Sequence, residues 1–375
     1  MGDTDPGHEH PEQKSHLMVL CHGLWGDTNH MESIETLIKS THPQLIVLNL
    51  ADNRGIATYD GIDVCAKRAM REIAPHLSTS DRISFVGYSL GGLILRYLIG
   101  LMQLDGTFDR VSPIYYISFA TPHLGTHKPF MSGHVFNAAQ SVFLYRVGNQ
   151  FSVSDSTALQ SRPLLLVMAD PDLSFMKGLG RFRQRILLAN TQNDRSVRFT
   201  TANISMTNPY TRFQKRVVDA KYPSIIEVTD QILVIPPTSS QDIALSAART
   251  AMFILVLPLW FVIAGTVLTT MSMRARINAI SIPVEDTLAH EEITENSGND
   301  SLSSSENDEI PQHLTVRNER AYMIRNLNNL AWTKIHTSIE TWNSHATIVQ
   351  RVVRGEDYAG YDVIRFVFQE LIKNL

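Results

Sequence analysis

Cysteine is scarce in this sequence: only Cys21 and Cys65 occur among 375 residues. Both lie in apolar segments that we expect to be buried, which argues against a disulfide framework and for a reducing compartment. An excess of basic residues is also missing, because the formal net charge is −4. Since surfaces that bind nucleic acid are basic, no nucleic-acid partner is predicted.

The N-terminal residues 1–15 lack the apolar run of a secretory signal peptide. They are rich in Asp, Glu, His and Pro, and we expect a disordered lead. The chain as a whole is 43% apolar, which is enough for a substantial core. We place that core in two parts, residues 16–235 and residues 313–375.

One long stretch without any charge stands apart, Ala251 to Met273, and arginines flank it. Its length of about 23 residues would cross a bilayer, so residues 249–276 are predicted to be a membrane anchor. A buried core helix and an interfacial helix lying flat are the alternatives. The acidic, Ser- and Asn-rich residues 285–312 that follow are predicted to be a disordered linker.

Short, almost continuously apolar runs alternate with helical patterns along the rest of the chain. This alternation is typical of an α/β fold with a doubly wound, mostly parallel sheet, whose strands are buried on both faces. The anchor and linker then form an insertion between the last two strands. A less regular region, about residues 126–161, is expected to cover the site like a lid. The predicted strands are 17–21, 45–50, 83–86, 113–120, 185–189 and 332–339; the predicted helices are 31–39, 62–77, 90–102, 320–330 and 361–375.

A serine lies in a sharp turn between one of these strands and a helix, in the run Gly87-Tyr88-Ser89-Leu90-Gly91. This pattern is typical of a nucleophile elbow, in which the serine side chain projects from the end of the sheet. A helix that begins just after the serine also points backbone N–H groups at charge developing beside the hydroxyl. Ser89 is therefore the candidate nucleophile.

A nucleophilic serine needs a base and an acid that orients the base. In sheets of this kind the order along the chain is serine, then Asp or Glu after a late strand, then His before the last helix. Asp194 and His345 meet this requirement. Asp170 and Asp172 are the alternative acids, although no clear strand precedes them.

The sequence has 14 histidines, so other bases were weighed. His336 falls within a predicted strand and is expected to be structural. His123 and His127 follow an earlier strand, where they could line the pocket but are poorly placed as a base. His22, Tyr88 and His123 are the predicted substrate contacts.

An oxyanion hole needs two preorganised N–H donors. The backbone N–H groups of Leu90, which follows the nucleophile, and of Leu24, in the loop after the first strand, are the candidates. Neither a metal nor another cofactor is predicted.

Five blocks together resemble a known family: LCHGLWG at 20–26, GYSLGG at 87–92, FATPHLG at 119–125, LLANTQNDRSV at 187–197 and SHATIV at 344–349. They are similar to the serine esterase family of α/β-hydrolases, and within it to fungal lipid-droplet lipase- or phospholipase-like members. The resemblance covers about residues 16–202 and 316–375. It implies a triad of Ser89, Asp194 and His345, and activity on acyl esters of lipids.

The triad constrains how the apolar stretch can lie. Ser89 and Asp194 precede it and His345 follows it, so a single crossing would place the base on the opposite side of the membrane. We therefore expect the stretch to enter and leave on the same side, with Pro258 bending it.

The predicted function is hydrolysis of lipid acyl esters at a membrane or lipid-droplet surface. The expected location is a lipid droplet or the endoplasmic reticulum membrane, with the catalytic domain facing the cytosol. An acyltransferase with the same triad and a non-catalytic membrane tether are the alternatives. No protein partner is predicted.

Overall fold

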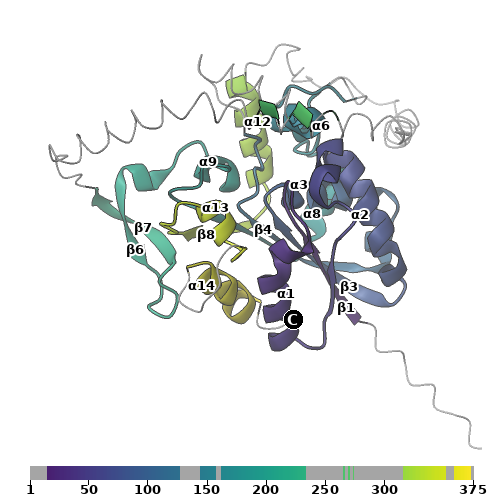
Figure 1. Ribbon diagram of the computed structural model, residues 1–375, viewed down its shortest axis with the longest axis horizontal. Coiled ribbons are helices and arrows are strands. Elements are labelled where there is room, and N and C mark those ends of the chain that lie inside the picture. Colours follow the sequence, from purple (N-terminus) through teal and green to yellow (C-terminus); the bar gives the residue numbers. More distant parts are fainter. Residues whose placement is uncertain are drawn as a thin grey trace, which may run out of the picture.

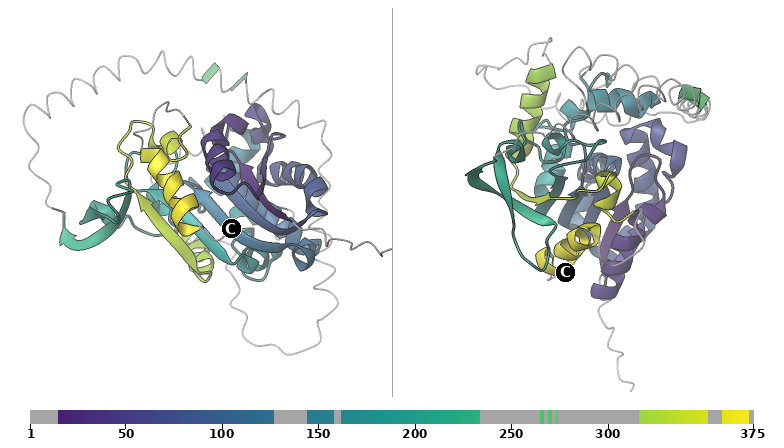
Figure 2. Two further views of the ribbon diagram at one scale, coloured as in Figure 1. Left: turned by 90° about the horizontal axis from the view of Figure 1, so that it is seen from below. Right: turned by 60° about the vertical axis from the view of Figure 1, so that its left-hand side comes forward.

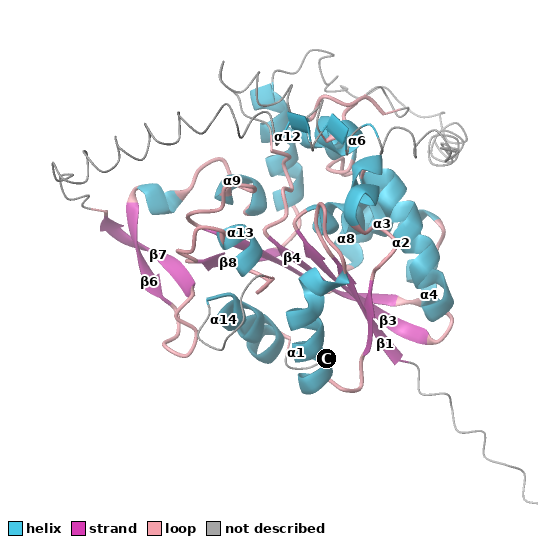
Figure 3. Ribbon diagram, in the orientation of Figure 1, coloured by secondary structure: helices cyan, strands magenta, loops and turns pink. Residues whose placement is uncertain are grey.

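Eight strands form one central sheet, which helices cover on both faces in the computed structural model (Figure 1). The structure describes residues 15–126, 144–157, 162–233, 265–266, 269–270, 273, 316–351 and 359–372. Figure 3 shows the strands as a central layer between two sets of helices.

Six neighbouring strands of the sheet are parallel, and the last two form an antiparallel hairpin at one edge. This arrangement confirms the predicted class: an α/β-hydrolase fold with a doubly wound, mostly parallel sheet. From edge to edge the strands are β2 (Ile46–Asn49), β1 (Ser15–Cys21), β3 (Ser80–Tyr88), β4 (Ser112–Phe119), β5 (Gln184–Asn190), β8 (Trp332–Thr337), β7 (Ile225–Ile232) and β6 (Phe213–Val217).

The helices divide into two layers, and each layer packs into its own apolar cluster (Figure 2). One layer contains α2 (Ile62–Leu77), α3 (Leu90–Leu104), α4 (Thr107–Arg110), α7 (Leu164–Val167), α8 (Ser174–Arg181) and α12 (Val316–Asn328). The other contains α1 (Glu32–Thr41), α14 (Ala359–Arg365) and the π-helical turn η4 (Phe366–Leu371). Short helical segments lie between the main elements: η1 (Thr28–Met31), η2 (Gly55–Asp60), α6 (Tyr145–Ser152), α9 (Phe199–Ala202), η3 (Pro209–Thr211) and α13 (Ser344–Thr347).

Residues 17–21 of strand β1 show why the central strands contain continuous apolar runs. Leu17 and Val19 join the cluster under α2 and α3, whereas Met18 and Leu20 join the cluster under α1 and α14. Successive side chains of a strand point to opposite faces, so a strand covered on both sides needs an apolar residue at each step. Each side chain fully buried in this way contributes about 1.5–3 kcal/mol.

Both cysteines are buried and free, in agreement with the prediction. Cys21 ends β1, and Cys65 lies on the inner face of α2. Burial raises the pKa of the Cys65 thiol to about 12 and raises the pKa of Cys21 as well. Both side chains therefore behave as small apolar residues rather than as reactive thiols.

The structure contains elements that the sequence did not predict, among them α8 and the hairpin of β6 and β7. The hairpin of β6 and β7 was not predicted, because its residues are largely exposed and include several charges, unlike the apolar runs of the central strands. The hairpin joins the sheet through only two residue pairs, Ile225 with Thr337 and Ile226 with His336. Strand β1 also begins at Ser15, the last residue of the predicted lead.

Several predicted segments lie outside the described residues. These are the lead up to residue 14, most of the lid-like region (127–143 and 158–161), the acidic linker 285–312, and the anchor 249–276 apart from 265–266, 269–270 and 273. In the lid-like region the structure describes α6. Among the residues that the structure describes, no helix has both the length and the apolar character needed to cross a membrane.

Candidate active site

The carboxyl ends of three parallel strands bring the predicted triad together. Ser89 follows β3, Asp194 follows β5 by four residues, and His345 lies on α13 after β8. Because β3, β4, β5 and β8 are parallel neighbours, the loops after them meet at one edge of the sheet.

Ser89 has a strained backbone conformation, with φ 54° and ψ −124°. Such a conformation is rare for a residue other than glycine, and it persists only when the surroundings enforce it. Here β3 and α3 meet without any intervening loop, and the N–H of Ser89 donates to the carbonyl of Phe119 at 2.9 Å. A Cβ at Gly91 would lie 2.1 Å from the carbonyl oxygen of Cys21, so only glycine fits where α3 approaches the end of β1.

The three side chains form a continuous hydrogen-bonded chain. His345 Nε2 lies 3.0 Å from Ser89 Oγ, and His345 Nδ1 lies 2.8 Å from Asp194 Oδ2. A carboxylate can only accept, so Nδ1 carries the proton and donates it to Asp194. Nε2 then has its lone pair free to accept the hydroxyl proton of Ser89, as a general base must.

Asp194 is held in place by the turn that follows it. Its Oδ1 accepts the backbone N–H groups of Ser196 at 2.9 Å and Val197 at 2.7 Å. The side chain is 2% exposed, whereas the His345 side chain is 12% exposed. The carboxylate is therefore shielded from water and has one oxygen left for the imidazole, which strengthens that bond.

His345 is positioned by its own short helix and by a tyrosine beneath it. The Asn343 side chain accepts the N–H of Ala346 and caps α13. The hydroxyl of Tyr88, the residue before the nucleophile, donates to the backbone carbonyl of His345 at 3.0 Å. The two rings lie 5.1 Å apart between centroids. The elbow thus contacts the base directly as well as through Ser89.

The loop after β1 lies against the nucleophile, as predicted for an oxyanion loop. A Cβ at Gly23 would lie 2.8 Å from Ser89 Cβ. The carbonyl of Gly23 accepts bonds from the N–H of Gly26 and from His22 Nδ1, each at 3.0 Å. In the described part of the chain, no acceptor is recorded for the N–H of Leu24 or of Leu90. Both groups are available to a substrate oxygen.

The three predicted substrate contacts are all buried. His22 and His123 are 0% exposed and Tyr88 is 1% exposed. His22 supports the Gly23 carbonyl and Tyr88 supports His345, while His123 Nε2 bonds to Ser118 Oγ at 3.0 Å within the core. Their positions correct the expectation of direct contact: His22 and Tyr88 support the site from beneath, and His123 packs inside the fold.

The alternative acids and bases lie elsewhere. Asp170 pairs with Arg162 at 2.7 Å and accepts the Tyr322 hydroxyl, and it also caps the N–H of Asp172. His336 bonds through one ring nitrogen to Tyr210 and through the other to Asn203, in the structural role predicted for it. His127 lies outside the described residues.

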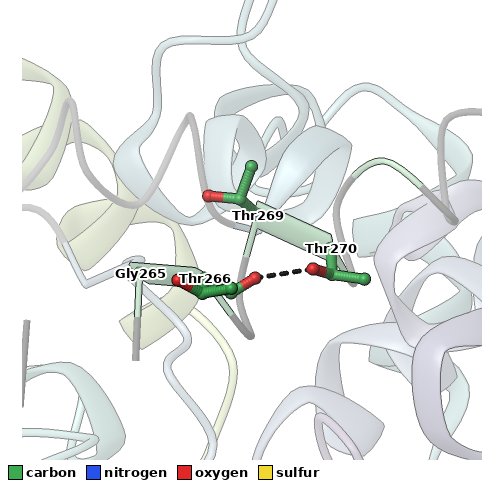
Figure 4. Close-up of a pocket in the computed structure, with 4 residues that line it drawn as sticks. All are labelled: Gly265, Thr266, Thr269 and Thr270. Atoms are coloured by element: carbon green, nitrogen blue, oxygen red, sulfur yellow. Dashed lines mark hydrogen bonds between the residues drawn. The ribbon is translucent and has the colours of Figure 1, made fainter. Parts of the chain in front are cut away.

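A pocket lined by Gly265, Thr266, Thr269 and Thr270 is shown in Figure 4. In it the hydroxyl of Thr270 donates to the carbonyl of Thr266 at 2.7 Å. None of the lining residues belongs to the predicted site, and the pocket offers neither a base nor an acid for nucleophilic chemistry.

One residue with many contacts at this edge was not predicted. Asn190, the last residue of β5, is buried and bonds to the loop that carries His345. The sequence places this asparagine directly after the predicted strand 185–189, but its partner Ile339 lies 149 positions away. No local pattern reveals such a partner.

Comparison with known protein families gives one match, to the family described as "Putative serine esterase (DUF676)", over residues 11–207. The matched segment includes the elbow, the loop after β1 and Asp194.

Two curated fungal proteins are similar to the chain. "Putative lipase C4A8.10" of Schizosaccharomyces pombe is 30% identical over 211 residues, which is 52% of this chain and 27% of that protein. "Putative lipase ROG1" of Saccharomyces cerevisiae is 29% identical over 206 residues, which is 52% of this chain and 29% of that protein. The similarity thus spans less than a third of either relative.

Two solved structures show a distant likeness to the chain. Phospholipase PlaB from Legionella pneumophila is 14% identical with a TM-score of 0.33, covering 60% of this chain and 50% of that one. A putative cell surface hydrolase from Lactobacillus plantarum is 15% identical with a TM-score of 0.31, covering 51% and 75%. Scores of this size add nothing to the fold assignment, which rests on the sheet topology.

Proposed function

The chain belongs to the putative serine esterase family, and on that premise we propose that it is a hydrolase that cleaves acyl ester bonds of lipids through Ser89, His345 and Asp194. The observation that supports this most strongly is the unbroken chain of hydrogen bonds from Ser89 Oγ through the imidazole to the Asp194 carboxylate.

The reaction follows from the direction of these bonds. Ser89 Oγ attacks the ester carbonyl carbon while its proton passes to His345 Nε2. The imidazolium that forms is stabilised by the buried carboxylate of Asp194. When the tetrahedral intermediate collapses, His345 returns the proton to the departing alcohol. Water then attacks the acyl-enzyme with His345 again as base and releases the fatty acid.

The negative charge on the carbonyl oxygen falls beside two backbone donors. The N–H of Leu90 lies at the start of α3, where the helix dipole adds a partial positive charge. The N–H of Leu24 belongs to the same peptide unit as the Gly23 carbonyl, which two hydrogen bonds hold in place. The loss of one such donor typically lowers kcat about 10²- to 10³-fold.

A lipid surface is the proposed site of action. The support is the uncharged stretch Ala251–Met273 in the sequence and the lipase names of the fungal relatives. For Ser89 and His345 to meet, the chain must have both ends of this stretch on one side of the membrane. We place the protein at a lipid droplet or at the endoplasmic reticulum membrane, with the sheet in the cytosol.

Hydrolysis of a soluble short-chain ester by the full chain tests the chemistry apart from the membrane. The wild type should release acid and alcohol, and Ser89→Ala should reduce the rate to background. A folded wild type with no activity on soluble or vesicle-borne esters would contradict the proposal. If an added alcohol acceptor receives most of the acyl group, the enzyme is a transferase instead.

Deletion of Ala251 to Met273 tests the proposed anchor separately. The deleted protein should leave the membrane fraction while keeping its activity on the soluble ester, because the deleted stretch contains no triad residue. Continued sedimentation with membranes would contradict the assignment of this stretch as the anchor.

A further inference from the structure

The triad acid and base come from loops that are distant in sequence. Asp194 and His345 are 151 positions apart, and the chain between them contains the β6–β7 hairpin, the apolar stretch and the acidic linker. Neighbouring strands β5 and β8 bring the two loops to the same edge of the sheet. Beyond the ends of these strands, the backbone hydrogen bonds between β5 and β8 no longer fix how one loop lies against the other.

The side chain of Asn190 spans this junction. Its Oδ1 accepts the backbone N–H of Ile339 at 2.9 Å and the hydroxyl of Thr337 at 3.2 Å. Its Nδ2 donates to the carbonyl of Ile339 at 3.3 Å and to the carbonyl of Gln192. Gln192 stands two residues before the triad acid, and Ile339 stands on the loop that leads to the triad base.

Every hydrogen-bonding position of this amide is used. An amide oxygen accepts two bonds and an amide nitrogen donates two, and Asn190 makes all four. The side chain is buried, because the residue is 2% exposed. In a buried network, water cannot replace a lost partner, so each missing bond leaves a backbone group unsatisfied.

The same junction has other contacts, and some of them are more exposed. Thr191 Oγ1 also donates to the carbonyl of Thr337 at 3.0 Å in the interior. Asn193 Nδ2 donates to the carbonyl of Glu340 at 3.0 Å, and Gln192 Nε2 donates to Ser338 Oγ at 3.1 Å. Asn193 and Glu340 are surface residues, where water competes for the same groups. Water can replace these exposed contacts more easily than the buried amide of Asn190, which is 2% exposed.

We propose that Asn190 is a positioning residue of the triad, which joins the Asp194 loop to the His345 loop and so sets the distance between the carboxylate and the imidazole. This role rests on the proposed hydrolase function. Asn190 contacts backbone of both loops and does not reach Ser89 or the oxyanion donors. Its effect passes through the Asp194–His345 contact.

Asn190→Asp is the sharpest test, because the two side chains have the same shape. The change keeps one acceptor oxygen but replaces the Nδ2 donor with an oxygen that faces the carbonyls of Gln192 and Ile339. The two loops should shift relative to each other. Since a misplacement of about 1 Å lowers catalysis about 10²-fold, we expect kcat on the soluble ester to fall about 10- to 100-fold. KM should stay within about twofold of the wild-type value, because no substrate contact is lost.

A double-mutant cycle separates positioning from general damage. When Asp194→Asn has already removed the carboxylate, Asn190→Asp should lower kcat by less than about threefold, because residues that act as one unit are not additive. An equal loss in both backgrounds would overturn the proposal, since it would show that Asn190 acts independently of Asp194.

Asn53→Asp is the matched control. Asn53 is an equally buried asparagine that donates to the carbonyl of Cys65 at 2.9 Å, and its side chain bonds to no triad residue. Asn53→Asp should leave kcat unchanged even if it lowers the stability of the protein. If Asn190→Asp does not fold, Asn190→Ser replaces it in the same cycle. A wild-type kcat in a folded Asn190 variant overturns the proposal, whereas an inactive wild type refutes the hydrolase function itself.

Discussion

A methyl group added to the start of α3 should damage activity far more than stability. In Gly91→Ala the new Cβ would lie 2.1 Å from the Cys21 carbonyl oxygen and 2.5 Å from the His22 carbonyl oxygen. Ordinary contacts between non-bonded heavy atoms are about 3.5 Å, so the end of β1 and the start of α3 must separate by roughly 1 Å. Both neighbours are backbone atoms, which cannot rotate away.

The change in stability of Gly91→Ala is the sum of two opposing effects. Overpacking of a well-packed site costs about 1–3 kcal/mol, whereas replacing glycine by alanine within a helix returns about 1 kcal/mol. We expect a net loss of up to about 2 kcal/mol in the free energy of unfolding. The displaced backbone leads into Gly23 and Leu24 of the oxyanion loop, so kcat/KM should fall about 10²-fold.

Gly180→Ala provides the matched control in another helix. A Cβ at Gly180 would meet only Leu330, at an ordinary 3.6 Å. This variant should keep its activity and gain up to about 1 kcal/mol in stability. Urea unfolding followed by circular dichroism gives the stability, and hydrolysis of a soluble short-chain ester gives kcat/KM. If both alanine variants behave alike, the account of the close contact at Gly91 is wrong.

Two further predictions concern the support of the triad and the response to pH. Tyr88→Phe removes the hydroxyl that donates to the His345 carbonyl at 3.0 Å. Such a bond is worth about 0.5–1.5 kcal/mol, so its loss should lower kcat roughly 2- to 10-fold and leave KM unchanged. An unaltered kcat would show that this bond does not orient the base. Burial lowers the pKa of His16 from 6.5 to about 4. Between pH 6.5 and pH 4, His16 therefore binds a proton in the unfolded chain but not in the folded one. The free energy of unfolding should decline as the pH falls through this range. Urea unfolding at pH 7 and pH 5 should show a smaller loss of stability in His16→Gln than in the wild type. Equal losses would show that His16 is not responsible for the pH dependence.

Much of the fold could be predicted because the central strands are parallel and covered on both faces. An apolar residue at every position, as in Leu17–Cys21, is the direct consequence of that burial. The helix predicted over residues 62–77 begins and ends at those residues in the structure. The hairpin of β6 and β7 escaped prediction because it is solvent-exposed and only lightly attached to the sheet, so it has no comparable pattern.

The sequence likewise predicted some of the site residues and missed others. Ser89, Asp194 and His345 could be placed because each lies at a fixed point relative to a strand end, and the structure brings all three within hydrogen-bonding distance. The substrate contacts could not be placed from the sequence, because a histidine after a strand suits the core as well as a pocket. His123 is buried. Asn190 could not be placed either, because its role depends on a loop that only the folded sheet brings near.

Covalent labelling by a fluorophosphonate tests the central claim most directly, because the reagent loses fluoride and phosphonylates a serine that a working triad has activated. Mass spectrometry of the labelled full chain should find the adduct on Ser89, with no adduct in Ser89→Ala and much slower labelling in His345→Ala. A folded wild type that stays unlabelled, or one labelled at another serine, would contradict the account.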